Sequence, residues 1–229
     1  MKSSIAALCV AMGLPCAAAS GAIFFTFQDP GPEREVTVQE NEDNSLSFTY
    51  SFVDTVALSL TCDDGEIPNT TFAETRLSLN VTTNGSPVVD QPGLMVANLS
   101  GTFVFEDVSG VDPVTILTGQ YTDAVATLLM ASFMGQIEGS GSVAGDTAVG
   151  SVQLFAGDAL LALLDPGESL GGRQTSSFAF SELTGGDDER GLMTLVGSAA
   201  FTGSSEVIPA PGGAALIGMG VLAAARRRR

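Results

Sequence analysis

Hydrophobic and polar residues alternate with a period of two along much of this chain. In residues 45–53 the side chains of Leu46, Phe48, Tyr50 and Phe52 fall on one face, and serine or threonine occupies most of the other. Successive side chains of a β-strand point to opposite faces, so this spacing predicts a strand with one buried face.

Phenylalanines repeat the same spacing in two later segments. Phe103 and Phe105 lie within residues 101–106, and Phe178 and Phe180 occupy the corresponding places of a second segment. Residues 24–27 open the series. The distances between these segments are too irregular for a structural repeat, so they predict similar core positions within one domain.

Other segments of the chain predict further strands and the turns between them. The further strands are residues 35–40, 55–61, 76–82, 94–99, 114–121, 148–156 and 192–201. Glycine, proline, asparagine and aspartate predict turns at residues 63–65, 83–87, 91–93, 165–167 and 185–188. Residues 123–133 fit either a helix or a buried strand, and residues 158–164 predict a single helical turn. The pattern predicts an all-β fold, a single antiparallel β-sandwich or jelly-roll-like domain of about nine to twelve strands.

The C-terminal segment, residues 207–229, has a different pattern. A proline-containing motif precedes an apolar run of about fourteen residues, 212–225, and basic residues end the chain. A helix of that length rises about 21 Å, against about 30 Å for the hydrocarbon core, so the run can cross a membrane only marginally. Terminal arginines favour the cytoplasmic side, which places the preceding body outside. The motif is Val207, Ile208, Pro209, Ala210 and Pro211, and the basic cluster is Arg226, Arg227, Arg228 and Arg229.

This layout resembles the PEP-CTERM sorting signal of bacteria that make exosortases. The shared features are a short proline motif, a thin transmembrane run and an arginine-rich end. The family's usual Pro-Glu-Pro is here Pro209-Ala210-Pro211. The resemblance covers about the last 23 residues. It implies export, recognition by a membrane-embedded exosortase-type enzyme, cleavage near the proline motif, and release or attachment at the cell surface. A permanent single-pass anchor is the alternative interpretation.

The N-terminus carries the features of a secretory signal peptide, residues 1–19. Lys2 supplies a positive charge, residues 5–14 supply an apolar segment, and residues 17–19 are small alanines suited to signal peptidase. Cys16 admits the alternative of lipidation, although a lipobox has small residues before its cysteine and Pro15 stands there. The expected organisation is therefore a signal peptide, an extracytoplasmic β domain over residues 20–206, and the sorting signal over residues 207–229.

The body between these signals is strongly acidic. Four basic residues face all 26 acidic residues there, which gives a formal net charge of −22. Such a field repels DNA, RNA and anionic headgroups, so we exclude nucleic-acid binding. Cys62 is the one cysteine of the body, so no disulfide can form within it, and its position predicts a small buried side chain.

The residues that this chain lacks limit its chemistry. It contains no histidine and no lysine after Lys2, which removes histidine-based triads, histidine metal sites, and P-loop or Schiff-base chemistry. Carboxylates are abundant, and a glycosidase needs two of them across a sugar. The chain has no tryptophan, a residue well suited to stacking on sugars, and a non-enzymatic body is the favoured interpretation.

Two acidic loops are weak candidates for calcium, which prefers clustered oxygen ligands. Neither loop has EF-hand spacing, and turn residues that face water are the favoured explanation of both. We therefore expect no cofactor other than weakly bound calcium. The candidates are Asp63, Asp64 and Glu66 in one loop and Asp187, Asp188 and Glu189 in the other.

The sequence thus predicts an exported, non-enzymatic protein of the cell surface or extracellular matrix. The resemblance to the sorting family implies association with exopolysaccharide and biofilm. The expected partners are an exosortase-type protease, extracellular polysaccharide, and the membrane before processing. A secreted carbohydrate-binding or carbohydrate-cleaving module is the alternative.

Overall fold

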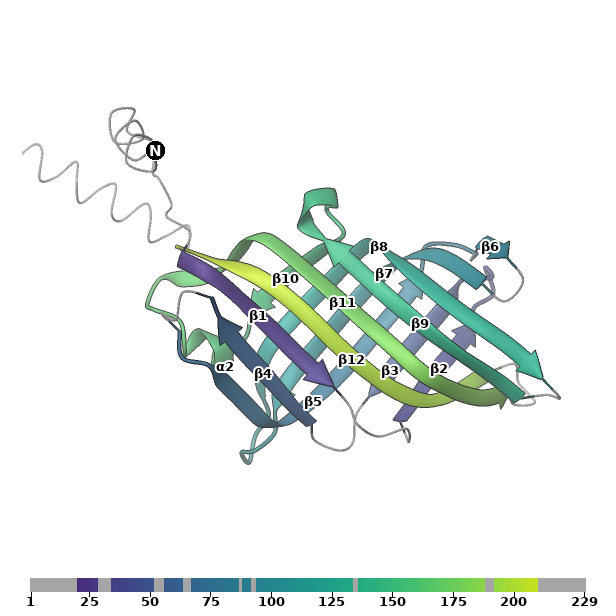
Figure 1. Cartoon of the computed structure of the whole chain (residues 1–229), viewed down its shortest axis with the longest axis horizontal. Coiled ribbons are helices and arrows are strands. Elements are labelled where there is room, and N and C mark those ends of the chain that lie inside the picture. The colour runs from purple at the N-terminus through teal and green to yellow at the C-terminus, as the bar shows by residue number, and fades with distance from the viewer. Residues whose placement is uncertain are drawn as a thin grey trace, which may run out of the picture.

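The computed structural model describes residues 20–28, 34–51, 56–63, 67–86, 88–91, 94–133, 136–187 and 192–209 (Figure 1). These residues form twelve strands, the four-residue helix α2 (Asp158–Leu161) and a 3-10 turn, η1 (Thr147–Val149). The strands are β1 (Ser20–Gln28), β2 (Arg34–Glu40), β3 (Leu46–Ser51), β4 (Val56–Cys62), β5 (Thr70–Thr83), β6 (Val88–Gln91), β7 (Leu94–Asp107), β8 (Val114–Phe133), β9 (Gln136–Asp146), β10 (Val152–Ala156), β11 (Glu168–Asp187) and β12 (Leu192–Pro209).

All twelve strands belong to one antiparallel sheet. Its order is β1-β4-β5-β3-β2-β12-β11-β9-β8-β7-β6, and β10 pairs with β8. Two further pairings, β1 with β12 and β5 with β7, close the sheet on itself. In Figure 1, β1, β12, β11 and β9 run diagonally across the near side while other strands cross behind them. The expected all-β antiparallel fold is confirmed, and its sandwich-like layers belong to one continuous sheet.

An aromatic cluster lies at the centre of the core. Phe103 is fully buried, and its ring centroid lies 5.0 Å from that of Phe178, 5.3 Å from that of Phe201 and 5.4 Å from that of Tyr121. These rings come from β7, β11, β12 and β8, so one cluster joins strands far apart in sequence. Tilted and edge-to-face pairs of this kind add about 0.5–1.5 kcal/mol each beyond their buried area. Phe103, Phe105 and Phe178 are confirmed as core positions, whereas Phe180 is partly buried against the core and Phe24 faces outward.

The long strand β8 changes partner near its middle. Residues 125–133 pair with β9, whereas residues 117–121 pair with β10. Asp123 lies between these two stretches and adopts a left-handed backbone with φ of 53°. An aspartate tolerates this conformation better than most residues do, because its short polar side chain can bond locally. The stretch left open as helix or strand is therefore part of a strand.

Some boundaries differ from the sequence-based expectations. The helical turn near residue 158 is confirmed as α2, whereas the strand expected from residue 148 begins only at Val152, because η1 occupies residues 147–149. The turn expected at residues 185–188 was wrong for its first three positions, since Gly185, Gly186 and Asp187 pair with β12. The glycine- and serine-rich strand β9 was not predicted, because glycine is depleted in strands and only the neighbours β8 and β11 define it.

Candidate functional site

The outer face of β11 and β12 carries a set of hydroxyl groups. Along β11, Ser176 and Phe178 point into the core, whereas Thr175 and Ser177 point outward. Strand β12 alternates in the same way. This is the period-two pattern of a strand with one face on the core, and it leaves short polar side chains on the other face.

Strand register places these hydroxyls in two rows that cross the strands. The first row begins with Phe24 of β1, which pairs with Ser204 of β12. Ser204 in turn pairs with Thr175 of β11, and Thr175 pairs with Asp146 of β9. The Oγ1 atom of Thr175 and the Oγ atom of Ser204 lie 2.7 Å apart and share a hydrogen bond.

The second row lies alongside the first. Thr26 of β1 pairs with Thr202 of β12, Thr202 pairs with Ser177 of β11, Ser177 pairs with Ala144 of β9, and Ala144 pairs with Val125 of β8. Neighbouring strands are about 4.8 Å apart, so four steps span about 19 Å across the sheet.

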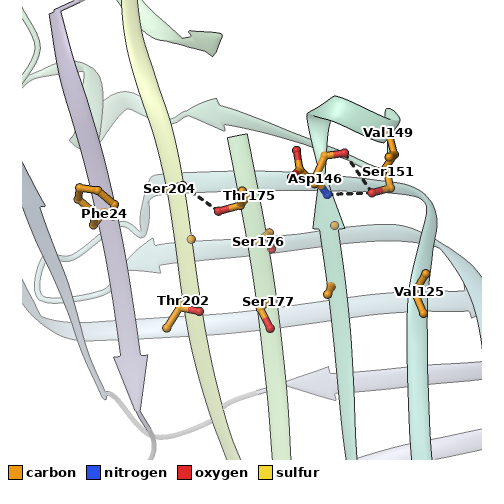
Figure 2. Close-up of a pocket in the computed structure, with 13 residues that line it drawn as sticks. Phe24, Val125, Asp146, Val149, Ser151, Thr175, Ser176, Ser177, Thr202 and Ser204 are labelled. Carbon is orange, nitrogen blue, oxygen red and sulfur yellow. Dashed lines mark hydrogen bonds between the residues drawn. The ribbon is translucent and has the colours of Figure 1, made fainter. Parts of the chain in front are cut away.

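Between and around these rows lies an open groove of about 490 Å³. Figure 2 shows Thr202, Ser204, Thr175 and Ser177 along it, with Phe24 beyond β12 on one side and Val125 on the other. The groove therefore has hydroxyls in its middle and apolar side chains at both ends.

Small residues and a buried hydrogen bond form the floor of the groove. A β-carbon on Gly203 would lie 2.8 Å from the ring of Phe201, so only glycine fits there without a shift. Beneath β11, the hydroxyls of Tyr121 and Ser176 are 2.5 Å apart. Burial raises the pKa of Tyr121, and its hydrogen bond with Ser176 opposes that rise in part. The floor is therefore a closely packed, uncharged layer.

Asp146 stands at the rim, where its carboxylate is already engaged. Oδ1 accepts from the backbone N of Ala148 at 2.7 Å, and Oδ2 accepts from Arg173 at 3.2 Å. The hydrogen bond from Ala148 lowers the pKa of Asp146 below its ordinary value, and Arg173 acts in the same direction. Asp146 is the one carboxylate among the described residues that line the groove, and it is held ionised.

The structure describes only two of the calcium candidates, Asp63 and Asp187. Asp63 follows β4, and its Oδ1 accepts from the backbone N of Ala22 at 2.7 Å, which extends the pairing of β1 with β4. Asp187 is the last residue of β11. In the part of the chain that the structure describes, no three acidic or cysteine side chains form a group able to hold a metal ion. The remaining candidates, Asp64, Glu66, Asp188 and Glu189, lie outside the described residues.

The proposed sorting motif overlaps the last strand. Val207, Ile208 and Pro209 belong to β12, and Val207 is only 1% exposed and pairs with Leu170 and Ser20. Ala210, Pro211, the apolar run 212–225 and Arg226 to Arg229 lie outside the described residues, as do residues 1–19. Among the residues that are described, no helix has both the length and the apolar character that a membrane crossing requires.

The groove residues are not recognisable as a site from the sequence. Serine and threonine at residues 175–177, 202 and 204 are visible in the sequence, but such residues usually face water without further consequence. The register that aligns them across β1, β12 and β11 depends on long-range pairing, which no local pattern encodes.

Cys62 lies half-buried at the end of β4 and packs against the core, so it is less enclosed than its sequence position suggested.

Comparison of the chain with protein-family models, with curated proteins and with solved structures finds no match.

Proposed function

We propose that this chain is an exported, non-catalytic protein of the cell surface or extracellular matrix whose β domain associates with extracellular polysaccharide. A signal peptide over residues 1–19 directs export, and an exosortase-type enzyme processes the segment that follows Pro209. The proposal combines the resemblance at the C-terminus with the groove on the outer face of β1, β12 and β11.

The observation that carries the proposal is the lining of the groove. Thr175, Ser177, Thr202 and Ser204 offer hydroxyl groups in register across two strands, beside the exposed ring of Phe24. Hydroxyls both donate and accept hydrogen bonds, as sugar hydroxyls do, so the two surfaces are chemically complementary.

The same lining supports binding over cleavage. Glycosidases use two carboxyl groups across the scissile bond, and the acid of the pair has a raised pKa. Asp146 has a lowered pKa, and no second carboxylate stands opposite it among the described lining residues. The groove therefore favours a binding role.

The two ends of the domain lie next to each other, which supports attachment from one side. Ser20 at the start of β1 pairs with Val207 near the end of β12. The first residue of β1 and the last residues of β12 therefore lie side by side, so attachment through either end would hold the domain at the same point.

The test follows the full chain in the cells that produce it. We expect surface or matrix protein that begins near Ser20 and lacks Arg226 to Arg229 by intact-mass measurement, together with binding of matrix polysaccharide without its cleavage. Surface protein with a complete C-terminus would make this a permanent single-pass anchor. Protein confined to the cytoplasm would refute export, and turnover of a polysaccharide that disappears in the Asp146→Asn variant would make the domain a hydrolase.

A further inference from the structure

The geometry points to a more specific ligand: we infer that the groove binds a chain of uncharged sugars laid across β1, β12 and β11. This inference rests on the proposed association with polysaccharide and adds the ligand class and the residues that recognise it. Phe24 provides the apolar platform, and Thr202, Ser204, Thr175 and Ser177 provide the polar contacts.

The dimensions of the groove fit an extended chain. The row from Phe24 to Asp146 covers three strand spacings, and so does the part of the second row that lines the groove, from Thr202 to Val125, so each spans about 14 Å. The groove is open along its outer side, so a polymer can enter it sideways. A single sugar would fill only a part of this length.

The hydroxyl groups are arranged to contact a neutral polar ligand. The hydroxyl oxygens of Thr175 and Ser204 are hydrogen-bonded at 2.7 Å, which orients both side chains. A hydroxyl has one donor and two acceptor positions, so each retains capacity for a ligand after that bond. Thr202 is exposed on the outer face of β12 beside Ser177. These uncharged side chains can donate hydrogen bonds to sugar hydroxyls and accept hydrogen bonds from them.

Phe24 supplies an apolar surface, which the hydroxyl groups do not provide. Its ring is 43% exposed on the outer face of β1, between Thr61 of β4 and Ser204 of β12. A sugar ring has an apolar face of C–H groups and an edge of hydroxyls, and an aromatic ring next to hydroxyl groups is complementary to both. Covering Phe24 would remove apolar surface from water, which favours binding.

Charge decides between neutral and acidic polysaccharides. The mature body carries a formal net charge of −22, and Asp146 at the groove rim is held ionised. Arg173, the cation next to the rim, is paired with Asp146 at 3.2 Å. A uronic acid in the groove would therefore meet a negative field, whereas a neutral sugar would not.

The experiment titrates the full chain, purified in detergent, with dextran, cello-oligosaccharides and galactan as neutral probes and alginate as the acidic probe. At an ionic strength of about 0.15 M, we expect saturable binding of at least one neutral probe and no binding of alginate. Binding of alginate in preference to every neutral probe would overturn the inference.

Matched variants locate the contact. Phe24→Ala should weaken binding of the neutral probe by about tenfold, and Thr202→Val should weaken it in the same direction. Phe155→Ala and Thr49→Val change equally exposed side chains on β10 and β3, outside the groove, and should alter affinity by about twofold at most. Equal effects of groove and control variants would place the site elsewhere.

The inference and the proposed function can fail separately. If the Phe24→Ala protein still associates with matrix polysaccharide in cells as the parent does, the groove is not the site, but the proposed function stands. If the parent protein binds neither the neutral probes nor matrix polysaccharide, the proposed function itself fails. Circular dichroism of each variant checks that the β fold is retained.

Discussion

The side-chain amide of Gln174 pairs with the backbone of Leu154 as a neighbouring strand would. Its Oε1 accepts from Leu154 N at 2.9 Å, and its Nε2 donates to Leu154 O at 3.0 Å. Nε2 also donates to Ser205 Oγ at 3.1 Å, so this buried amide is satisfied on both sides. The contact joins β10 to β11 where β9 has already ended, next to the irregularity in β11 between Gly171 and Gln174.

Replacing Gln174 should therefore destabilise the domain more than its size suggests. Gln174→Met keeps the approximate shape but leaves the buried N–H and C=O of Leu154 without partners, at an expected cost of about 1–3 kcal/mol. Urea unfolding followed by circular dichroism measures the loss. The control is Gln153→Met, at the exposed neighbouring position of β10, which should change stability by less than about 0.5 kcal/mol. Equal losses of stability in the two variants would mean that the hydrogen bonds between Gln174 and Leu154 contribute little to stability.

Gly119 should not tolerate a side chain. A β-carbon there would overlap the ring of Phe103, which the aromatic core holds in place. We expect Gly119→Ala to lower the free energy of unfolding by about 1–3 kcal/mol through overpacking. In the control, Gly110→Ala, the nearest atom would be at an ordinary 3.7 Å, and the change should be small. If Gly119→Ala left the free energy of unfolding unchanged, the core around Phe103 would have room for an added methyl group.

Tyr121 should make stability fall at alkaline pH. Burial raises its pKa in the folded state above the unfolded value of about 10. Above that pH the unfolded chain releases the phenolic proton while the folded chain retains it, so stability is complete below pH ~10 and declines as the pH rises further. Denaturant midpoints measured across this range should show the decline, and Tyr121→Phe should reduce it. An unchanged slope in that variant would assign the decline to other groups.

The domain should require residues beyond Glu206. Val207 is almost completely buried in β12, and burial of a valine side chain contributes about 1.5–3 kcal/mol. A chain that ends at Pro209 should therefore unfold at higher denaturant than one that ends at Glu206. Val207→Ala in the longer chain should act in the same direction as the truncation. Equal stability of the two chains would place the domain boundary at residue 206, as the sequence pattern suggested.

The alternating segments were the most predictable part of the fold. Phe103, Phe105 and Phe178 reach the core because period-two alternation and burial are local and mutually consistent. The glycine-rich strand β9 escaped prediction because its pairing with β8 and β11, and not its own propensity, makes it a strand. The overlap of Val207 with β12 was likewise hidden, since Val-Ile-Pro before an apolar run fits a strand end and a sorting motif equally well.

The groove lay beyond sequence reasoning for a related reason. Thr175 and Ser204 are 29 positions apart, and only the pairing of β11 with β12 brings their hydroxyls within 2.7 Å. Phe24 joins them through the pairing of β1 with β12, which also closes the sheet. A local pattern identifies outward-facing serines and threonines, but it does not say which of them become neighbours.

The most direct test of the proposed polysaccharide binding is equilibrium binding of the purified full chain to extracellular polysaccharide from cultures of the cells that produce it. The length of the polysaccharide chains is measured in the same samples. The account predicts saturable binding, weakened by Phe24→Ala, with chain length unchanged. Absence of binding, or shortening of the chains, would contradict a non-catalytic polysaccharide-binding domain.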